Sequence, residues 1–243
     1  MTIRPIVHAA TFCSRILLWL AVPTLAMAAP AKDPLFQQLA ASAPSLGKEV
    51  LKSALQATRC AVDNGMAAPA RLAVIDFSKP SSEKRLWIFD LDQGALLYQE
   101  LVAHGRNSGG LLSTSFSNRE GSYQSSIGLF QAAESYSGKH GYSLRLDGLE
   151  PGINDKARER AIVIHGADYV DPTWIENHGR IGRSHGCPAV RQEIIREVVD
   201  HLKGGQLVFT WYPDQRWLQS SSFLNCSGQR VAGGGDNLGD GGS

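Results

Sequence analysis

The sequence has no marked excess of charge of either sign. Its 24 lysines and arginines are nearly matched by 23 aspartates and glutamates, and the formal net charge is +1. Proteins that bind nucleic acid usually carry a strongly basic surface, so we expect no nucleic acid partner. The chain also has no internal repeat. Its 243 residues are enough for one domain with a substantial hydrophobic core.

Long hydrophobic runs are also scarce. The most apolar stretch, residues 16–22, is too short to span a bilayer comfortably. Arg4 and Arg15 precede it and the small residues 26–28 (Ala-Met-Ala) follow it, an arrangement typical of a secretory signal peptide over residues 1–28. We therefore expect export and no transmembrane span after cleavage. An uncleaved N-terminal anchor is the alternative.

Cysteine is rare, with four in the chain. Cys13 lies in the expected signal peptide, which leaves Cys60, Cys187 and Cys226. An odd number of cysteines in an oxidising compartment indicates one disulfide and one free thiol. We predict that Cys60, at the end of the first helix, pairs with Cys226, just after the last strand; two unpaired buried thiols are the alternative. The spacing of Cys187 and the histidines fits no structural zinc pattern, so we expect no metal.

The hydrophobic pattern predicts a mainly β fold with flanking helices. Helical spacing begins near Ser45, a candidate N-cap, and stops at Gly65. A second helix is predicted over residues 191–202. Between and after these helices, short apolar stretches recur about every ten residues, which is typical of an antiparallel β domain. They are residues 72–77, 85–91, 95–103, 127–132, 142–146, 160–165 and 206–211.

We divide the chain into the signal peptide (1–28), a linker with an N-terminal helix (29–65), a β domain (66–226) and a tail (227–243). The tail is rich in glycine, a composition that predicts disorder. Within the β domain, residues 104–126 form a long polar connection. Loops of this length in compact domains are often functional.

Residues 162–191 (IVIHGADYVDPTWIENHGRIGRSHGCPAVR) carry the residues best suited to catalysis. Cys187 is a candidate nucleophile, and a thiolate forms readily only where a neighbour lowers the thiol pKa. The helical pattern that follows it suggests a helix N-terminus as one such neighbour. His165 ends an apolar strand, a rigid position for a general base. The amides of Gly186 and Cys187 are candidate oxyanion donors.

The spacing of these residues resembles a known signature. His165-Gly166 is followed by Ser184-His185-Gly186-Cys187, with 22 positions from His165 to Cys187. This resembles the catalytic signature of the L,D-transpeptidases, the YkuD-type domain. Residues 125–130 (SSIGLF) are similar to the strand that lines the donor site in that family. The resemblance covers roughly residues 70–212.

One position departs from the family pattern. The usual run has arginine two residues after the cysteine, whereas here Ala189 holds that place and Arg191 follows two positions later. Together with the segments HGRNSG and FSN…GS, this is similar to the divergent second type of murein L,D-transpeptidase domain.

The resemblance implies a YkuD-like β-sandwich or barrel and a reaction without metal or organic cofactor. Cys187 would be acylated by a peptidoglycan tetrapeptide stem with release of D-Ala, and the acyl group would pass to an amine. His165 would move the proton, while Ser184, His185 and Gly186 would shape the site. The resemblance also places the protein in the periplasm or cell wall of a bacterium. Candidate substrate-binding residues are Arg183, Arg191, Gly166 and Tyr169; for the arginines, a salt bridge or surface charge is the alternative.

Other interpretations of the sequence stay open at this point. The acceptor could be water, as in an L,D-carboxypeptidase or a hydrolase of cross-links, and a non-catalytic cell-wall binding module is an alternative of another class. His178 is expected at the surface, and His104 and His140 either line the cleft or lie in solvated turns. We expect a monomer.

Overall fold

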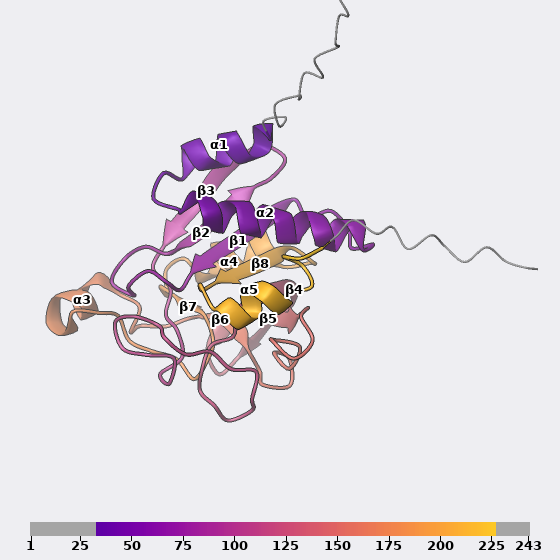
Figure 1. Ribbon diagram of the computed structural model, residues 1–243. Helices are drawn as coiled ribbons and strands as arrows, with labels where there is room; N and C mark the ends of the chain where they lie inside the picture. Colours follow the sequence, from indigo (N-terminus) through magenta and orange to yellow (C-terminus); the bar gives the residue numbers. More distant parts are fainter. Residues whose placement is uncertain (1–32, 227–243) are drawn as a thin grey trace, which may run out of the picture. The chain divides into compact units, whose positions relative to one another are not determined.

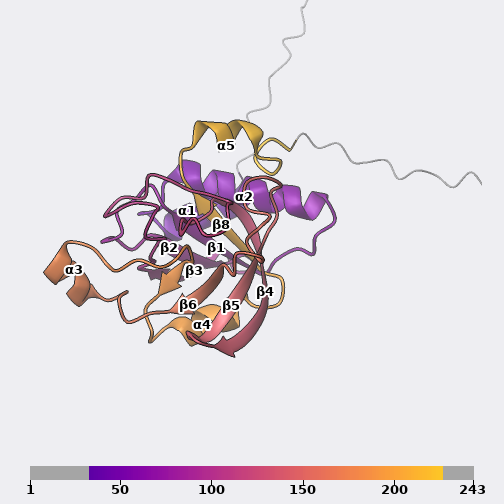
Figure 2. The ribbon, with the colours of Figure 1, turned by 90° about the horizontal axis from the view of Figure 1, so that it is seen from below.

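The computed structural model describes residues 33–226 (Figures 1 and 2). The expected signal peptide and the glycine-rich tail lie outside these residues. Eight strands form a single sheet in the order β3-β2-β1-β8-β4-β5-β6-β7. In chain order they are β1 (Arg71–Asp76), β2 (Leu86–Asp90), β3 (Ala95–Glu100), β4 (Gly128–Gly138), β5 (Gly141–Gly148), β6 (Val163–Gly166), β7 (Ala189–Val190) and β8 (Leu207–Trp211).

The two edge strands of this sheet come together. Just beyond β3, the amide of Ala103 donates to the carbonyl of Ala189 in β7 at 2.8 Å. This contact joins the two edges of the sheet, so the strands form a nearly closed barrel. Two strand pairs, β1 with β8 and β6 with β7, are parallel, and the other pairs in the sheet are antiparallel. The predicted class, mainly β with flanking helices, is confirmed.

Helices cover both faces of the sheet. They are α1 (Pro34–Ser42), α2 (Lys48–Asp63), α3 (Pro172–His178), α4 (Ile195–Leu202) and α5 (Gln215–Ser220). Figure 2 shows α2 and α5 on one side of the strands and α4 on the other, while α3 projects from the body. In β1, Leu72 and Val74 pack with the α2 side, and Ala73 and Ile75 pack with α4. Successive strand residues point to opposite faces, so a strand covered on both faces is apolar throughout.

Several boundaries differ from the sequence predictions. The N-cap of α2 is Gly47 and not Ser45, whose hydroxyl instead accepts a hydrogen bond from Gln99 Nε2 at 2.8 Å. The predicted strand 95–103 ends at Glu100. Residues of α1 and α2 belong to the main hydrophobic core, so there is no packing boundary at residue 66.

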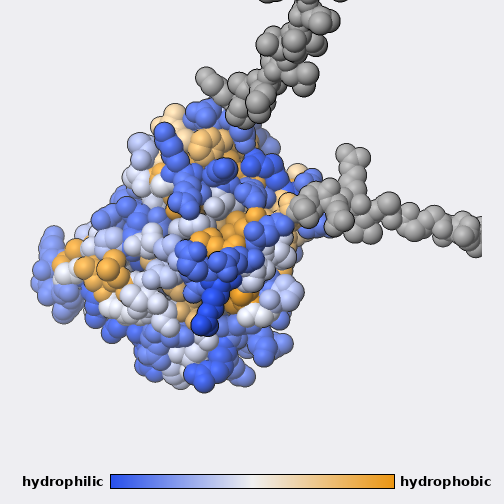
Figure 3. Space-filling view, in the orientation of Figure 1, coloured by the Kyte–Doolittle hydropathy of each residue, from blue (hydrophilic) through white to orange (hydrophobic). Residues whose placement is uncertain are grey.

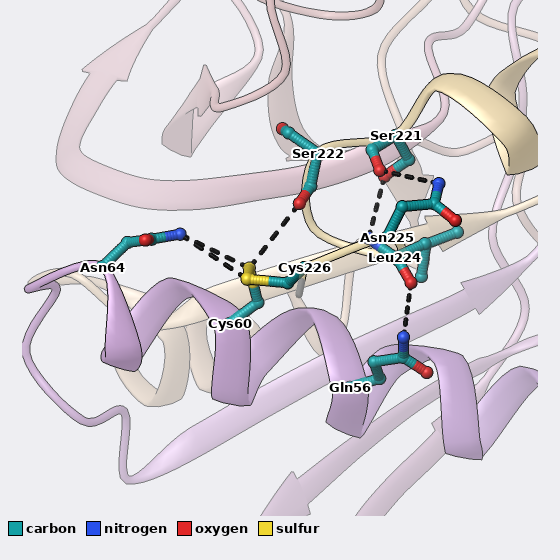
Figure 4. Close-up of a disulfide and its surroundings, with 8 residues drawn as sticks. All are labelled: Gln56, Cys60, Asn64, Ser221, Ser222, Leu224, Asn225 and Cys226. Carbon is teal, nitrogen blue, oxygen red and sulfur yellow. Dashed lines mark hydrogen bonds between the residues drawn. A yellow bond between two sulfur atoms is a disulfide. The ribbon is translucent and has the colours of Figure 1, made fainter. Parts of the chain in front are cut away.

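The predicted disulfide between Cys60 and Cys226 is present (Figure 4). Cys60 lies on α2, and Cys226 lies 166 residues later, in the segment after α5. Gln56, one turn earlier on α2, donates to the carbonyl of Leu224. The disulfide and this hydrogen bond together fasten the segment after α5 to α2.

The face of the molecule seen in Figure 3 is largely hydrophilic. Figure 3 shows small hydrophobic patches separated by hydrophilic atoms, one of them in the region of α3. Within residues 33–226, no helix combines the length and apolar character needed to cross a membrane.

Candidate active site

The Ser184–Cys187 turn is locked by its own hydrogen bonds. The hydroxyl of Ser184 donates to the carbonyl of Cys187 at 2.6 Å and accepts from the amide of Gly186 at 3.0 Å. Gly186 has a φ of 128°, in the region that favours glycine. A Cβ at Gly186 would lie 2.9 Å from the carbonyl oxygen of Gln124. Both the serine and the glycine are therefore needed for the shape of the turn.

The long polar loop at residues 104–126 braces this turn from outside. The amide of Ser184 donates to the carbonyl of His104 at 3.0 Å. Ser125 Oγ donates to the carbonyl of Gly186 and accepts from the amide of Gly105, both at 2.9 Å. Gly105 lies so close that a Cβ on it would be 2.9 Å from Gly186 Cα. The loop thus forms one wall of the site.

Cys187 is the free cysteine of the described residues, and its side chain is partly exposed. Its Sγ lies 3.6 Å from the carbonyl oxygen of Ala161, which can accept the S–H. Ala161 has a φ of 52°, which is uncommon for a residue with a side chain. Backbone strain of this kind tends to occur at functional sites.

Arg160 is the charged neighbour of Cys187 that the sequence analysis missed. Burial raises the pKa of the Cys187 thiol, and the positive charge of Arg160 opposes that rise. The guanidinium is fixed by two carbonyls of the 104–126 loop, Ser117 and Gln124, each at 2.6 Å. Its position as the first residue of the predicted strand 160–165 gave little sign of this contact, because the link is made through the tertiary fold.

The expected helix N-terminus beside Cys187 is wrong. Residues 189–190 pair with β6 as strand β7, and α4 begins only at Ile195. The helix dipole acts within about one turn of its end, so α4 does not lower the pKa of this thiol. Burial raises the pKa of the thiol, which favours its neutral form.

His165 occupies the neighbouring strand. It is buried in β6 and pairs in parallel with Ala189 of β7, two residues after Cys187. Its Nδ1 lies 2.8 Å from the carbonyl of Gly166, which can only accept, so Nδ1 carries the proton and Nε2 is left as a base. Burial lowers the pKa of His165, which favours the neutral imidazole. The ring of His140 stacks on it with centroids 4.6 Å apart.

Two cavities border the site. The first, of about 460 Å³, is lined in part by His140, His165, Gly166 and Tyr169. The second, of about 310 Å³, contains Tyr169, Arg183 and His185. Tyr169 lies on both, and burial together with the neighbouring Cys187 raises its pKa to about 12. Gly166 provides room, since a Cβ there would be 2.4 Å from Gln192 Oε1.

Two of the predicted roles are not available in this geometry. The amide of Gly186 is already bonded to Ser184, so it is not an oxyanion donor. The amide of Cys187 has no hydrogen-bond partner on another residue in the described part of the chain, and it remains the candidate donor. Arg191 makes a two-point ion pair with Glu100 at 3.0 and 2.9 Å, so the salt bridge replaces its predicted role in binding substrate.

The remaining histidines take different places. His104 is fully buried and lies 2.7 Å from the guanidinium of buried Arg85. Burial and the charge of Arg85 lower its pKa to about 4, so it is a neutral core residue and not part of a cleft. His178 is exposed at the end of α3, as expected. Residues 33–226 contain no group of three His, Cys, Asp or Glu side chains placed to hold a metal.

Comparison with known proteins agrees with these features. The family model for the L,D-transpeptidase catalytic domain, YkuD_2, matches residues 42–211, more than half of the chain. The chain therefore belongs to the L,D-transpeptidase catalytic domain family, whose members act on peptidoglycan peptides. No functionally curated protein matches the sequence.

Similar solved structures are remote. An L,D-transpeptidase from Mycobacterium smegmatis is 13% identical, with a TM-score of 0.38, over 59% of each chain. L,D-transpeptidase 3 from Mycobacterium tuberculosis is 13% identical, with a TM-score of 0.39, over 60% of this chain and 62% of its own. One from Stackebrandtia nassauensis is 16% identical, with a TM-score of 0.37, over 73% and 74%. The chain thus spans about three fifths of the first two, and at these TM-scores nothing about activity follows from them.

Proposed function

We propose that this protein is an exported cysteine L,D-transpeptidase that acts on peptidoglycan stem peptides in the periplasm or cell wall. The observation that carries the proposal is the Ser184–Cys187 turn. It holds a partly exposed free thiol beside the strand that bears His165, within a chain of the L,D-transpeptidase catalytic domain family. The pattern at residues 1–28 supports export.

The resting pair is a neutral thiol and a neutral imidazole, because burial raises the pKa of Cys187 and lowers that of His165. In the proposed reaction, Nε2 of His165 takes the thiol proton as sulfur attacks the carbonyl before D-Ala. The amide of Cys187 donates to the oxyanion that forms. The imidazolium then protonates the departing amine of D-Ala, and a thioester remains on Cys187.

The second half of the reaction runs the same steps in reverse with a new amine. His165 removes a proton from the acceptor amine as it attacks the thioester, and returns a proton to the sulfur as the C–S bond breaks. The products are a cross-linked peptide and the free thiol. If water is the acceptor, the same steps give a tripeptide, and the protein is then an L,D-carboxypeptidase.

Intact-protein mass spectrometry tests the proposal. Wild-type protein is incubated with a stem tetrapeptide, and separately with a carbapenem, beside the Cys187→Ala variant and a known L,D-transpeptidase. We expect an acyl adduct on the wild type and none on the variant. An unlabelled wild type, where the known enzyme is labelled, would refute the nucleophile and favour the binding-module alternative. Dimers among the products indicate transpeptidation, and tripeptides alone indicate hydrolysis.

A further inference from the structure

The second cavity beside the Cys187 turn is strongly cationic. We call it the arginine cavity. Three arginine side chains line it. They come from two separate segments, the 104–126 loop and the stretch between α3 and the turn. Its lining residues are Arg106, Tyr169, Trp174, Arg180, Gly182, Arg183 and His185.

Neutral groups hold these arginines in place. Arg183 Nη1 donates to the carbonyls of Arg106 at 3.1 Å and Gly109 at 2.8 Å. The guanidinium carbon of Arg106 lies 4.2 Å from the ring centre of Tyr123. Arg180 Nη1 donates to the carbonyl of Ile181 at 2.9 Å. Each guanidinium carries five N–H donors, so most donors on all three side chains remain free.

In the described part of the chain, no carboxylate neutralises this cluster. Among residues 33–226, none of the three arginines has an acidic side chain within 4.0 Å. Burial lowers the pKa of Arg183, and the charges of Arg180 and Arg106 lower it further. Like charges held together are unfavourable. A bound anion would relieve that repulsion and gain charge-assisted hydrogen bonds.

The arginine cavity is connected to the reacting thiol. Arg183 directly precedes Ser184, the first residue of the Cys187 turn, in the sequence. Tyr169, whose pKa is raised by burial and by nearby Cys187, forms part of the cavity wall. Its ring packs across Gly182, where a Cβ would be 2.4 Å from Tyr169 Cβ, and the Gly182 amide donates to the Tyr169 carbonyl at 2.7 Å. His185 of the Cys187 turn also lines the cavity, so one peptide can place an anionic group here and a carbonyl at Cys187.

The size of the cavity limits what the anion can be. At about 310 Å³ it is near the lower end of the range for ligand pockets. This volume suits one or two residues of a peptide, and the rigid planar donors of arginine match the geometry of a carboxylate. Trp174, on helix α3, lines one side of the cavity, and α3 itself projects from the body (Figures 1 and 2).

We propose that Arg106, Arg180 and Arg183 bind a carboxylate of the stem peptide that reacts at Cys187. This rests on the proposed function for the choice of peptide. It supplies the substrate-gripping charge that Arg191, paired with Glu100, does not provide.

Binding to a catalytically inactive protein tests the proposal without requiring turnover. The full chain carrying Cys187→Ala is titrated by calorimetry with a stem tetrapeptide that has all its carboxylates free. Two further peptides have a carboxamide in place of either the C-terminal carboxylate or the side-chain carboxylate of the diamino acid. Arg180→Gln and Arg183→Gln are added separately, and Arg59→Gln, an exposed arginine on α2, is the matched loss of charge.

We expect each cavity variant to weaken binding of the free peptide by on the order of tenfold. Arg59→Gln should bind as the parent does. One of the two amidated peptides should bind the parent about as weakly as the free peptide binds the cavity variants. Arg180→Gln should not weaken the binding of that peptide further, which identifies the carboxylate. Because Arg183 also bonds to loop carbonyls, Arg180→Gln is the variant that keeps the test independent of loop folding.

Three results would overturn the inference: unchanged affinity in Arg180→Gln, an equal loss on Arg180→Gln for the free peptide and for both amidated peptides, or no binding of the free peptide to the parent. The failure of the proposed function would be recognised by a different combination of results. If the wild type forms no acyl adduct but the Cys187→Ala protein shows the carboxylate-dependent loss, the cavity binds the peptide and the thiol is not a nucleophile.

Discussion

The guanidinium of Arg191 is held by the carboxylate of Glu100 through two hydrogen bonds, Nε to Oε2 at 3.0 Å and Nη2 to Oε1 at 2.9 Å. Glu100 ends β3 and Arg191 follows β7, so the pair joins the two edge strands of the sheet. It lies beside the Ala103–Ala189 hydrogen bond that brings those edges together. The arginine after the Ser184–Cys187 turn therefore helps to hold the two edges of the barrel together.

Removing this arginine should reduce stability more than activity. The side chains of Glu100 and Arg191 are 10% and 28% exposed, so Arg191→Gln leaves a mostly buried carboxylate with Lys84, 4.0 Å away, as its remaining cationic partner. We expect the free energy of unfolding to fall by about 1–3 kcal/mol, measured by urea denaturation. Glu193→Gln, whose partner distance is 3.8 Å and whose side chain is 67% exposed, should change it by less than about 0.5 kcal/mol. A stable Arg191→Gln protein with a tenfold higher KM for peptide would assign Arg191 to substrate binding instead.

Replacing Arg160 should raise the pKa of Cys187. Its positive charge favours the thiolate, so Arg160→Gln removes an interaction that lowers that pKa. We expect the pH profile of Cys187 alkylation by iodoacetamide to move to higher pH. Arg158→Gln removes the same charge from an exposed side chain that faces Asp147 and Glu134, and should leave the profile in place. A profile unchanged in both variants would show that Arg160 acts only on the loop it anchors.

The neutral resting pair predicts a broad pH range for acylation. The pKa of His165 lies below its ordinary 6.5, so more than half of the base is deprotonated at pH 6.5. The pKa of Cys187 lies above its ordinary 9.0, so the thiol is still protonated at pH 8. Acylation rates by a carbapenem should therefore change by no more than about twofold between these pH values, and at pH 7 iodoacetamide should alkylate Cys187 more slowly than free cysteine. A rise much larger than about twofold between pH 6.5 and pH 8 would contradict the neutral pair.

Loss of the disulfide should lower stability without touching the site. The bond closes a loop with a sequence separation of 166 residues, for which the chain-entropy account gives about 4 kcal/mol or slightly more. The Cys60→Ser/Cys226→Ser double variant should melt roughly 10 °C lower by calorimetry. Its acylation rate at 25 °C should match that of the wild type. Cys187→Ala should keep the wild-type melting temperature in oxidising buffer, and a drop as large as that of the double variant would imply a different disulfide partner.

Sequence patterns located the strands well because burial on two faces imposes apolar runs of strand length, as in Leu72–Ile75. They were less reliable where a tertiary contact competes with local preference. Residues 191–194 have helical spacing, yet the preceding Ala189 and Val190 pair with β6, which delays α4 to Ile195. Ser45 is a good N-cap residue by type, but its hydroxyl accepts from Gln99 Nε2 instead.

The sequence by itself determined the family, the mainly β class and the disulfide. Each depends on which residues occur and at what spacing along the chain, as with His165 and the Ser184–Cys187 turn. Only the tertiary structure decided how those residues are surrounded. Arg160 lies beside the thiol, and Glu100 forms an ion pair with Arg191. Three arginines that are unpaired among the described residues line one cavity. The physical reason is that charges act through space. A neighbour distant in sequence fixes whether a guanidinium is paired, buried or free to bind.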